Sequence, residues 1–485
     1  LSVEEFFRQA DKLKEDGNKL FKQCDYDKAE ACYRQVLTLL DTPPLNFDKI
    51  KMASLVVQTL SNLCAVHSKL KNWQEVIKLS TTVLLLDKHH LKALYRRGVA
   101  YAHVGKVTLS IIDLTTASAM RPNDEGIKKE LERVKAVNDS NKSKEGDAFE
   151  SIIDPEEEER IMSRPYIKEK IPELSLDDPR IIAFIKQDRP FIIKNAYLVK
   201  TAVEKWNLEY LSKHMGSSSM FEVFSSKINK FRYFDNTKNV GKYDVEFVME
   251  KEDMAFADFK TQYEQETRED GSQKYIYLQQ VLNQGVGDQI VEDFKTFGWE
   301  WVMSIANATG MGPLKFNTLW ISKKDIITMC HYDEAFNFFA QVKGRKRFIV
   351  FSPDEFKNLY PFPLHHANDR QTQVDIDDPD LKKFPNFQHA SGMTGVVGPN
   401  DVLFLPPYWF HHVRSIDDSI SVNFWFIMNQ SKPEEVKFPL SSVQRMAVRR
   451  NIESLIGEAM GPRGVGDFLA ELSSGRFQHV KFIES

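Results

Sequence analysis

The chain has 485 residues, of which 42% are hydrophobic, 28% charged and 12% aromatic, which excludes a largely disordered protein and predicts two or three domains. A net charge of −4 argues against a general polyanion binder, so we expect no nucleic-acid partner. The four cysteines form no CxxC pair and no apolar run reaches the ~18 residues of a membrane span, which favours a reducing, cytoplasmic location with a nuclear fraction left open.

Residues 1–137 have the pattern of helical hairpins. A helix over 10–21, a short polar turn and a second helix from Tyr26 make one hairpin, and the pattern starts again near 57 and 91. The last two starts are 34 residues apart, and an insertion around 41–44 explains the longer first interval. Small residues stand where the helices would cross: Gly17, Ala29, Cys64 and Gly98. A generic helical bundle would not give this period, which resembles the tetratricopeptide repeat, so we predict three such repeats.

The remaining chain changes in character twice. Residues 138–163 are polar and end in an acidic run, which predicts a linker that buries no core. From 164 to 430 short apolar runs alternate with turns, and the clearest runs are 189–194, 319–321, 347–351, 401–405 and 419–426. These runs predict an antiparallel sandwich or barrel. Apolar residues at helical spacing return after 431, which predicts a C-terminal helical segment to residue 485.

His331 and Asp333 form the sharpest chemical signal. Positions i and i+2 of a strand face the same side, so we expect this imidazole and this carboxylate to converge. His411 or His412 offers a third ligand, 78 residues or more after Asp333, and the two would point to opposite faces of a strand. Two histidines and one carboxylate are the ligands of non-haem Fe(II) oxygenases, because they leave coordination positions open. An HxD tripeptide is common by chance, and these residues alone do not choose between the two histidines.

Further motifs surround these residues over about 164–476. They comprise the segments 277–280, 328–347, 359–366, 369–375, 384–388, 397–401 and 422–425. Together they resemble the JmjC hydroxylases, and most closely the factor-inhibiting-HIF asparaginyl hydroxylases. The resemblance implies a double-stranded β-helix, or cupin-like jelly roll, that uses Fe(II), 2-oxoglutarate and O₂. The expected fold class is therefore multidomain, with all-α tetratricopeptide repeats before an α+β JmjC domain and C-terminal helices.

The resemblance also implies a role for individual residues. Three residues match the metal ligands: His331, Asp333 and His411. Five match contacts to 2-oxoglutarate: Lys346, Thr328, Tyr277, Asn337 and Asn423. Lys346 would pair with the far carboxylate of the co-substrate, because a buried carboxylate needs a cation and donors to offset its desolvation. His412 would then have a structural role.

Four substrate contacts follow from the same resemblance: Tyr233, Arg370, Gln371 and Trp425. Tyr233 would line a peptide groove, Gln371 could present its amide to a substrate Asn, and Trp425 could form a wall of the pocket. A purely structural role is the alternative for each. Met329 and Cys330 depart from the family, and we interpret the Cys330 thiol as a small buried filler rather than an oxidation-prone site.

Five polar residues of the helical half match the carboxylate clamp of tetratricopeptide co-chaperones: Lys14, Asn18, Asn62, Lys92 and Arg96. All fall on the first helix of a hairpin, so we expect them to form one stripe along the concave groove. Their cations and amides suit the carboxylates of the Glu-Glu-Val-Asp tails of heat-shock chaperones. The alternative is that each is a solvated surface residue.

We therefore expect a protein hydroxylase that modifies Asn in an extended segment, with ankyrin repeats as one source of substrate. Asp and His targets stay open, and the alternatives are lysyl or arginyl hydroxylation, demethylation and a non-catalytic co-chaperone scaffold. The adjacent apolar residues Phe468 and Leu469, together with the paired C-terminal helices of the resembling hydroxylase, predict a homodimer through 431–485. Since the chain begins at Leu1, a lost targeting segment also stays open.

Overall fold

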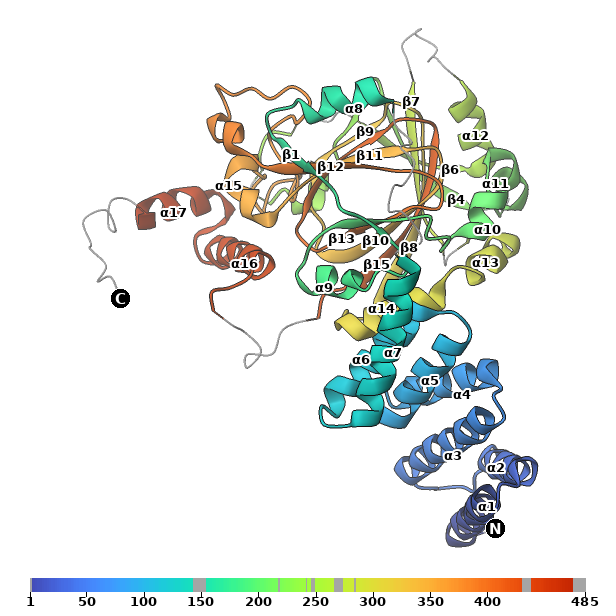
Figure 1. Ribbon diagram of the computed structural model, residues 1–485. Coiled ribbons are helices and arrows are strands. Elements are labelled where there is room, and N and C mark those ends of the chain that lie inside the picture. Colours follow the sequence, from blue (N-terminus) through green and yellow to red (C-terminus); the bar gives the residue numbers. More distant parts are fainter. Residues whose placement is uncertain are drawn as a thin grey trace. The chain divides into compact units, whose positions relative to one another are not determined.

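A computed structural model of the protein describes residues 2–142, 154–216, 219–240, 242–245, 249–265, 274–282, 285–429 and 438–473 (Figure 1). The chain folds into two compact units, one dominated by the N-terminal helices and the other by β-sheets. Within these described ranges, no helix combines the length and the apolar character that a membrane span requires.

The first unit is built from helical hairpins. Its helices are α1 (Val3–Lys22), α2 (Tyr26–Leu40), α3 (Lys49–Lys69), α4 (Trp73–Leu86), α5 (Leu91–His103), α6 (Val107–Met120) and α7 (Glu125–Lys142). A Cβ at Gly17 would lie 2.7 Å from Cε1 of Tyr33, and one at Gly98 would lie 2.9 Å from Cγ of Leu114. Only glycine therefore allows the helices of these two hairpins to approach so closely. The predicted helical-repeat architecture is confirmed, and α7 follows the third hairpin.

Part of the segment that we interpreted as a linker is helical. The acidic run forms α8 (Pro155–Met162), in which Ile161 is buried. The Asp154 side chain caps this helix by accepting from the Glu156 N–H at 3.1 Å, and Pro155 and the glutamates occupy the first turn, where fixed φ and negative charge are favourable. The expectation that this segment buries no core was therefore wrong at Ile161, and the capping pattern at 154–158 is the local signal for this helix. Residues 143–153 lie outside the described part of the chain.

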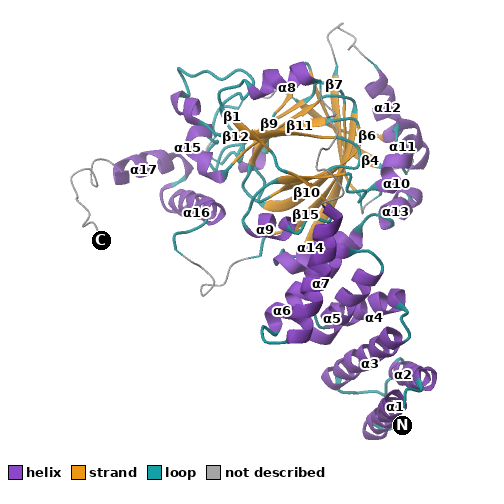
Figure 2. Ribbon diagram, viewed as in Figure 1, coloured by secondary structure: helices purple, strands orange, loops and turns teal. Residues whose placement is uncertain are grey.

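The second unit contains two β-sheets (Figure 2). The six-stranded sheet has the order β1 (Ile167–Lys170), β12 (Gly392–Val397), β11 (Lys346–Phe351), β14 (Phe410–Ser415), β9 (Ile327–His331), β5 (Lys230–Phe231). The nine-stranded sheet has the order β2 (Glu173–Ser175), β3 (Phe191–Lys194), β13 (Val402–Leu405), β10 (Ala335–Lys343), β15 (Ser419–Ile427), β8 (Leu314–Ser322), β7 (Tyr275–Val281), β4 (Met220–Ser226), β6 (Glu250–Ala255). Ile192, Phe339 and Phe348, which come from both sheets, share one buried cluster that packs the sheets together. The predicted double-stranded β-helix is confirmed.

Helices flank these sheets and end the described chain. They are α9 (Arg180–Lys186), α10 (Lys200–Lys205), α11 (Leu208–His214), α12 (Phe256–Glu264), α13 (Asp288–Lys295), α14 (Trp299–Thr309), α15 (Phe356–Leu359), α16 (Ser442–Met460) and α17 (Val465–Ser473). α16 starts with a capping box between Ser441 and Gln444. Its residues Val443 and Met446 are buried in a cluster that includes Tyr332, the residue between His331 and Asp333. The helix therefore packs directly behind the predicted metal-binding segment.

Candidate functional site

Three candidate metal ligands meet in one pocket of the second unit. His331 ends β9, His411 lies on β14, and the two residues are register partners of these neighbouring strands. One ring nitrogen from each and a carboxylate oxygen of Asp333 all lie within 4.8 Å of one another. Nε2 of His411 is 3.5 Å, and Nε2 of His331 is 4.0 Å, from Oδ2 of Asp333. This spacing suits one ion bound between three donor atoms.

Backbone carbonyls orient the two imidazole rings. Nδ1 of His331 lies 2.8 Å from the Met329 carbonyl oxygen, and Nδ1 of His411 lies 3.0 Å from that of Trp409. Because a carbonyl oxygen only accepts, each Nδ1 carries the proton and each Nε2 keeps a lone pair for a metal. Burial lowers the pKa of both histidines, so their rings are neutral at physiological pH.

Asp333 does not lie on a strand, contrary to our expectation. β9 ends at His331, and Asp333 sits in the turn that follows. Its carbonyl oxygen accepts from the Tyr408 N–H at 2.7 Å, and its Oδ1 accepts from Nη1 of Arg370 at 3.3 Å. These contacts, rather than strand alternation, turn the carboxylate toward the histidines. His412 points to the other side of β14, where its Nε2 lies 2.9 Å from the Asp377 carboxylate.

A buried lysine lies in the same pocket. Lys346 begins β11 and is 3% exposed, with Nζ 5.6 Å from the ring centroids of both Tyr277 and Phe339. Among the described residues no carboxylate forms an ion pair with it, and burial lowers the pKa of its ammonium group to about 7. A buried cation without a counter-ion is costly, so this end of the pocket favours an anionic ligand.

The structure brings every residue predicted for the catalytic site to this one pocket, whose volume is about 430 Å³. They are Tyr233, Tyr277, Thr328, His331, Asp333, Asn337, Lys346, Arg370, Gln371, His411, Asn423 and Trp425. Nδ2 of Asn423 donates to Oδ1 of Asn337 at 2.9 Å, but Oδ1 of Asn423 is buried without a partner in the described structure. The same holds for Nε1 of Trp425 and Nε of Arg370. These unpaired polar atoms are groups that a bound ligand would satisfy.

Gln371 is placed differently from its expected role. Its amide nitrogen donates to the carbonyl oxygen of Tyr233, and its side chain is buried. Part of the amide that we expected to meet substrate is therefore already used to hold the chain at Tyr233. The Tyr233 ring itself is 47% exposed at the mouth of the pocket, where a peptide could reach it.

Sequence reasoning missed several pocket residues: Gln279, Lys315, Thr318, Glu334 and Asp369. Gln279 stands two residues after Tyr277 on β7, and Thr318 is the register partner of Asn423 on neighbouring β8 and β15. Strand alternation from residues already recognised could have found both. Glu334 and Asp369 are chain neighbours of Asp333 and Arg370, and no local pattern indicates their role.

The helical unit has a groove of about 830 Å³ lined by all five predicted clamp residues: Lys14, Asn18, Asn62, Lys92 and Arg96. Nδ2 of Asn62 donates to Oδ1 of Asn18 at 3.0 Å, which joins α3 to α1. Nη1 of Arg96 donates to the carbonyl and hydroxyl oxygens of Ser61 at 2.8 and 3.1 Å, and burial lowers its pKa. The groove thus holds a partly buried guanidinium that has only neutral acceptors among the described residues.

The pocket that holds His331, Asp333 and His411 lies inside a segment that matches a known family model. The model of the cupin-like domain covers residues 181–432, more than half of the chain. The chain belongs to the cupin-like domain family. Its cupin-like domain contains all the catalytic-site residues named above.

The relatives that the chain matches have several different names. The chain is 40% identical over 110 residues to lysine-specific demethylase 8 of Xenopus tropicalis, covering 22% of this chain and 24% of that protein. It is 34% identical over 135 residues to human HSPB1-associated protein 1, covering 27% of each. It is 36% identical over 107 residues to JmjC domain-containing protein D of Dictyostelium discoideum, covering 21% of this chain and 23% of that protein. The matched stretches span about a quarter of these relatives, so the relatives do not fix the substrate of this chain.

Solved structures resemble the helical half. A C-terminal TPR-containing domain of a putative FK506-binding protein from Plasmodium falciparum is 27% identical, with a TM-score of 0.27 over 30% of this chain and 96% of that one. The first TPR of Spaghetti (RPAP3), bound to the HSP90 peptide SRMEEVD, is 26% identical, with a TM-score of 0.23 over 27% and 93%. The assignment of the helical unit rests on its own helices and crossings.

The residues of the cupin-like domain fit Fe(II) and 2-oxoglutarate. Two neutral imidazoles and a carboxylate are a suitable donor set for Fe(II), and the unpaired Lys346 suits the far carboxylate of a dicarboxylic acid. Cys330 is fully buried in a core cluster behind the pocket, where burial raises the pKa of its thiol. This position agrees with a filler rather than a reactive thiol.

Proposed function

We propose that the protein is an Fe(II)- and 2-oxoglutarate-dependent protein hydroxylase. The observation that carries this proposal is the joint presence, in one pocket, of the His331–Asp333–His411 cluster and the buried, unpaired cation Lys346. A purely scaffolding domain would have no need to keep an uncompensated ammonium group in its core, since that group lowers stability.

Each part of the pocket has a task in this reaction. Iron and 2-oxoglutarate, when bound, would supply the oxidation of a substrate C–H bond by O₂ with release of CO₂ and succinate. His331, Asp333 and His411 hold the metal, and Lys346 holds the far end of the co-substrate. Apolar side chains, among them Phe339 and Phe348, line the interior and exclude water from it. Tyr233 and Arg370 stand at the substrate side and orient the target side chain.

Arg370 favours a neutral target residue. Its guanidinium lies 3.3 Å from Asp333, beside the place where a substrate carbon must approach the metal. A lysine or arginine side chain would bring a second cation there, which the low local dielectric makes unfavourable. An Asn amide carries no charge and could pair with the free Oδ1 of Asn423 or with Nε of Arg370. We therefore propose asparaginyl β-hydroxylation, with extended segments such as those of ankyrin repeats as substrates.

Lysyl or arginyl chemistry is the second candidate, because one set of relatives is named lysine-specific demethylase 8. Incubation of the purified protein with Fe(II), 2-oxoglutarate and candidate peptides distinguishes the two. We expect succinate formation and a peptide mass increase of one oxygen atom localised to Asn. Loss of a methyl group or oxidation at Lys would support the second candidate, and no succinate with any peptide would contradict the hydroxylase proposal.

We further propose that the groove of the helical unit binds the Glu-Glu-Val-Asp tails of heat-shock chaperones. The guanidinium of Arg96, which meets only neutral acceptors, the exposed Lys92 and the linked amides of Asn18 and Asn62 offer cations and donors along one groove. Cytosolic chaperone tails as partners imply a cytoplasmic location for this protein, which we propose with a nuclear fraction left open.

Replacing Lys92 and Arg96 together by Ala should abolish binding of a peptide that ends in Glu-Glu-Val-Asp. Two charge-assisted contacts at about 1.5–3 kcal/mol each would be lost, and wild-type affinity should fall as salt screens them. Calorimetry at low and high salt measures both effects. The matched control replaces Arg34 and Lys78 by Ala. This double substitution removes the same amount of charge from positions outside the groove lining. The clamp proposal fails if wild type does not bind at low salt or if the control loses as much affinity.

We also propose a two-fold homodimer through the C-terminal helices. Val448, Ile452 and Leu455 form an exposed apolar row on α16, and Phe468 and Leu469 of α17 are only partly covered. Isologous pairing of such faces would bury them. The segments 430–437 and 474–485, which are part of the predicted dimerisation segment or flank it, lie outside the described residues.

Leu469→Arg should convert the dimer to monomers, because it places an unpaired charge at the proposed apolar seam. Light scattering at micromolar concentration measures the mass. Leu45→Arg introduces the same change at a leucine that is 92% exposed in the helical unit and serves as the control. A wild-type protein that is already monomeric would refute the dimer.

A further inference from the structure

One face of α16 follows the segment that carries Arg370. Met446, Arg450, Glu453 and Gly457 recur at spacings of three and four, so they share this face. Oε2 of Glu453 accepts the N–H of Leu364 at 2.9 Å. A Cβ at Gly457 would lie 2.3 Å from Nε2 of His365, so glycine is needed for this close approach.

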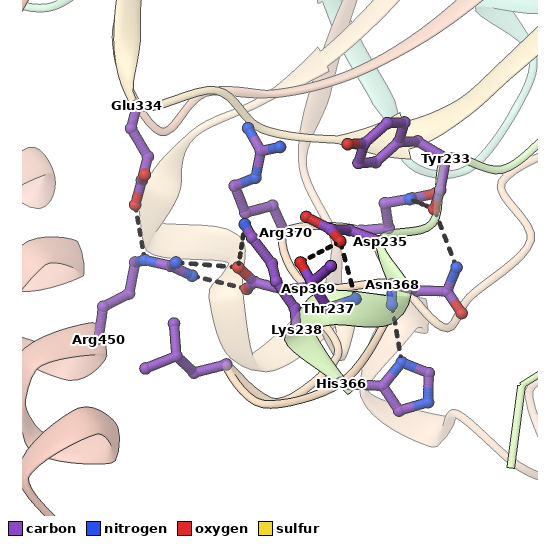
Figure 3. Close-up of polar contacts among 12 residues, drawn as sticks. Tyr233, Asp235, Thr237, Lys238, Glu334, His366, Asn368, Asp369, Arg370 and Arg450 are labelled. Carbon is purple, nitrogen blue, oxygen red and sulfur yellow. Dashed lines mark hydrogen bonds and ion pairs between the residues drawn. The ribbon is translucent and has the colours of Figure 1, made fainter. Parts of the chain in front are cut away.

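Arg450 stands at the centre of the contact (Figure 3). Its Nη1 and Nη2 donate to the two carboxylate oxygens of Asp369 at 2.7 and 3.0 Å. Its Nε lies 2.7 Å from Oε1 of Glu334, and Nη1 also donates to the Tyr332 hydroxyl at 2.7 Å. Asp369 is 4% exposed and also pairs with Lys238 at 3.5 Å. One guanidinium therefore joins three partners from two loops in a partly buried fork, the geometry that only Arg provides.

Each partner is the chain neighbour of a residue in the catalytic pocket. Tyr332 and Glu334 flank Asp333 on both sides, and Asp369 precedes Arg370, which donates to Asp333. The Tyr332 N–H donates to the Arg370 carbonyl oxygen at 3.0 Å, so the two loops are also joined by their backbones. Arg370 has φ +72°, a left-handed conformation that a non-glycine residue keeps only when its surroundings hold it. Arg450 connects both loops, through Tyr332, Glu334 and Asp369, to α16.

We propose that Arg450 is a positioning residue of the catalytic site, and that α16 is a structural part of that site. By clamping Glu334 and Asp369, Arg450 fixes the angle at which Asp333 meets the two histidines and keeps Arg370 beside it. The consequence for metal binding rests on the proposed function. The effect on the two loops does not, because it concerns contacts between residues of the chain alone.

Backbone amide exchange in the metal-free protein tests the proposal without any turnover. Arg450→Met removes the charge and the fork but keeps the length of the side chain. We expect exchange about tenfold or more faster at Tyr332, Thr372 and Tyr408, whose N–H groups donate to the Arg370, Cys330 and Asp333 carbonyls, with β11 unchanged. Arg445→Met is the matched control, because Arg445 ties the same helix to Asp354, away from the pocket.

Co(II) titration of the same proteins adds a second readout. Arg450→Met should weaken Co(II) binding by about 10–100-fold, the usual effect of losing a group that orients metal ligands, while Arg445→Met stays near wild type. The Co(II) affinity of Arg450→Lys, which keeps the charge without the fork, should lie between those of Arg450→Met and wild type. This variant tests the positioning role if Arg450→Met does not fold. Unchanged exchange in both Arg450 variants, or equal effects of Arg445→Met, would overturn the positioning role. If the wild type fails to bind Co(II), the proposed function is overturned. The positioning role of Arg450 is then tested by the amide exchange measurement alone.

Discussion

Asp333→Ala should abolish metal binding and 2-oxoglutarate turnover while the protein stays folded. The substitution removes the only anionic member of the His331–Asp333–His411 cluster, and two neutral imidazoles alone hold Fe(II) weakly. The Asp333 side chain lies in a turn at the pocket surface rather than in the core, so its loss should cost little stability. Calorimetric titration with Co(II) and succinate release measure the two effects.

Asp377→Asn is the matched control for this experiment. Asp377 also pairs with a histidine of β14, but that histidine is His412, on the opposite side of the strand. We expect the control to retain metal binding even if its thermal midpoint drops, since it also breaks the ion pair of Asp377 with Arg164. Wild-type turnover in Asp333→Ala would contradict the assignment of the metal site.

Lys346→Met should raise the KM for 2-oxoglutarate roughly 30-fold or more. Loss of one partner of a buried charge pair costs about 2–5 kcal/mol, which corresponds to a loss of affinity of roughly 30-fold or more. Steady-state kinetics at several 2-oxoglutarate concentrations give the KM. Lys343→Met, at the exposed end of β10, removes the same charge outside the pocket and should leave the KM unchanged.

The same lysine gives the protein a pH dependence with a definite sign. The pKa of Lys346 is about 7 in the folded protein and about 10.4 in an unfolded chain, so between these values the unfolded state binds more protons. Stability should therefore rise with pH by up to about 1.4 kcal/mol per unit from this group, and Lys346→Met should lose that slope. Co-substrate binding, which needs the ammonium form, should weaken as pH rises above 7. An affinity independent of pH from 7 to 9 would show that Lys346 is not the anion partner.

Local sequence patterns predicted those site residues that belong to recognisable motifs. His331, His411 and Lys346 stand in such motifs, and the apolar run 347–351 predicted the strand that Lys346 begins. The groove residues Lys14 to Arg96 followed from a repeat whose period fixes which face they share. In both cases short-range spacing determines direction, so a one-dimensional pattern suffices.

The other features of the site depend on contacts between distant parts of the chain, which local patterns do not predict. Arg450 and Asp369 are 81 residues apart, and only the docking of α16 brings them together. Glu334 is exposed beside the metal motif, and nothing local shows that Arg450 of a distant helix pairs with it. Asp333 was assigned to a strand that ends two residues earlier, since strand ends are set by partners such as Arg370 and Tyr408 rather than by propensity.

The position of α16 in the chain has a consequence for biosynthesis. Every residue that lines the catalytic pocket precedes Ser442, so a growing chain completes both β-sheets before the helix that carries Arg450 emerges from the ribosome. Until then the loops around Asp333 and Arg370 lack their contacts with Arg450. A nascent chain would hold His331, Asp333 and His411 only loosely, and the emergence of α16 would bring these side chains to their final geometry. The order of synthesis thus separates the emergence of both β-sheets from the formation of the Arg450 contacts.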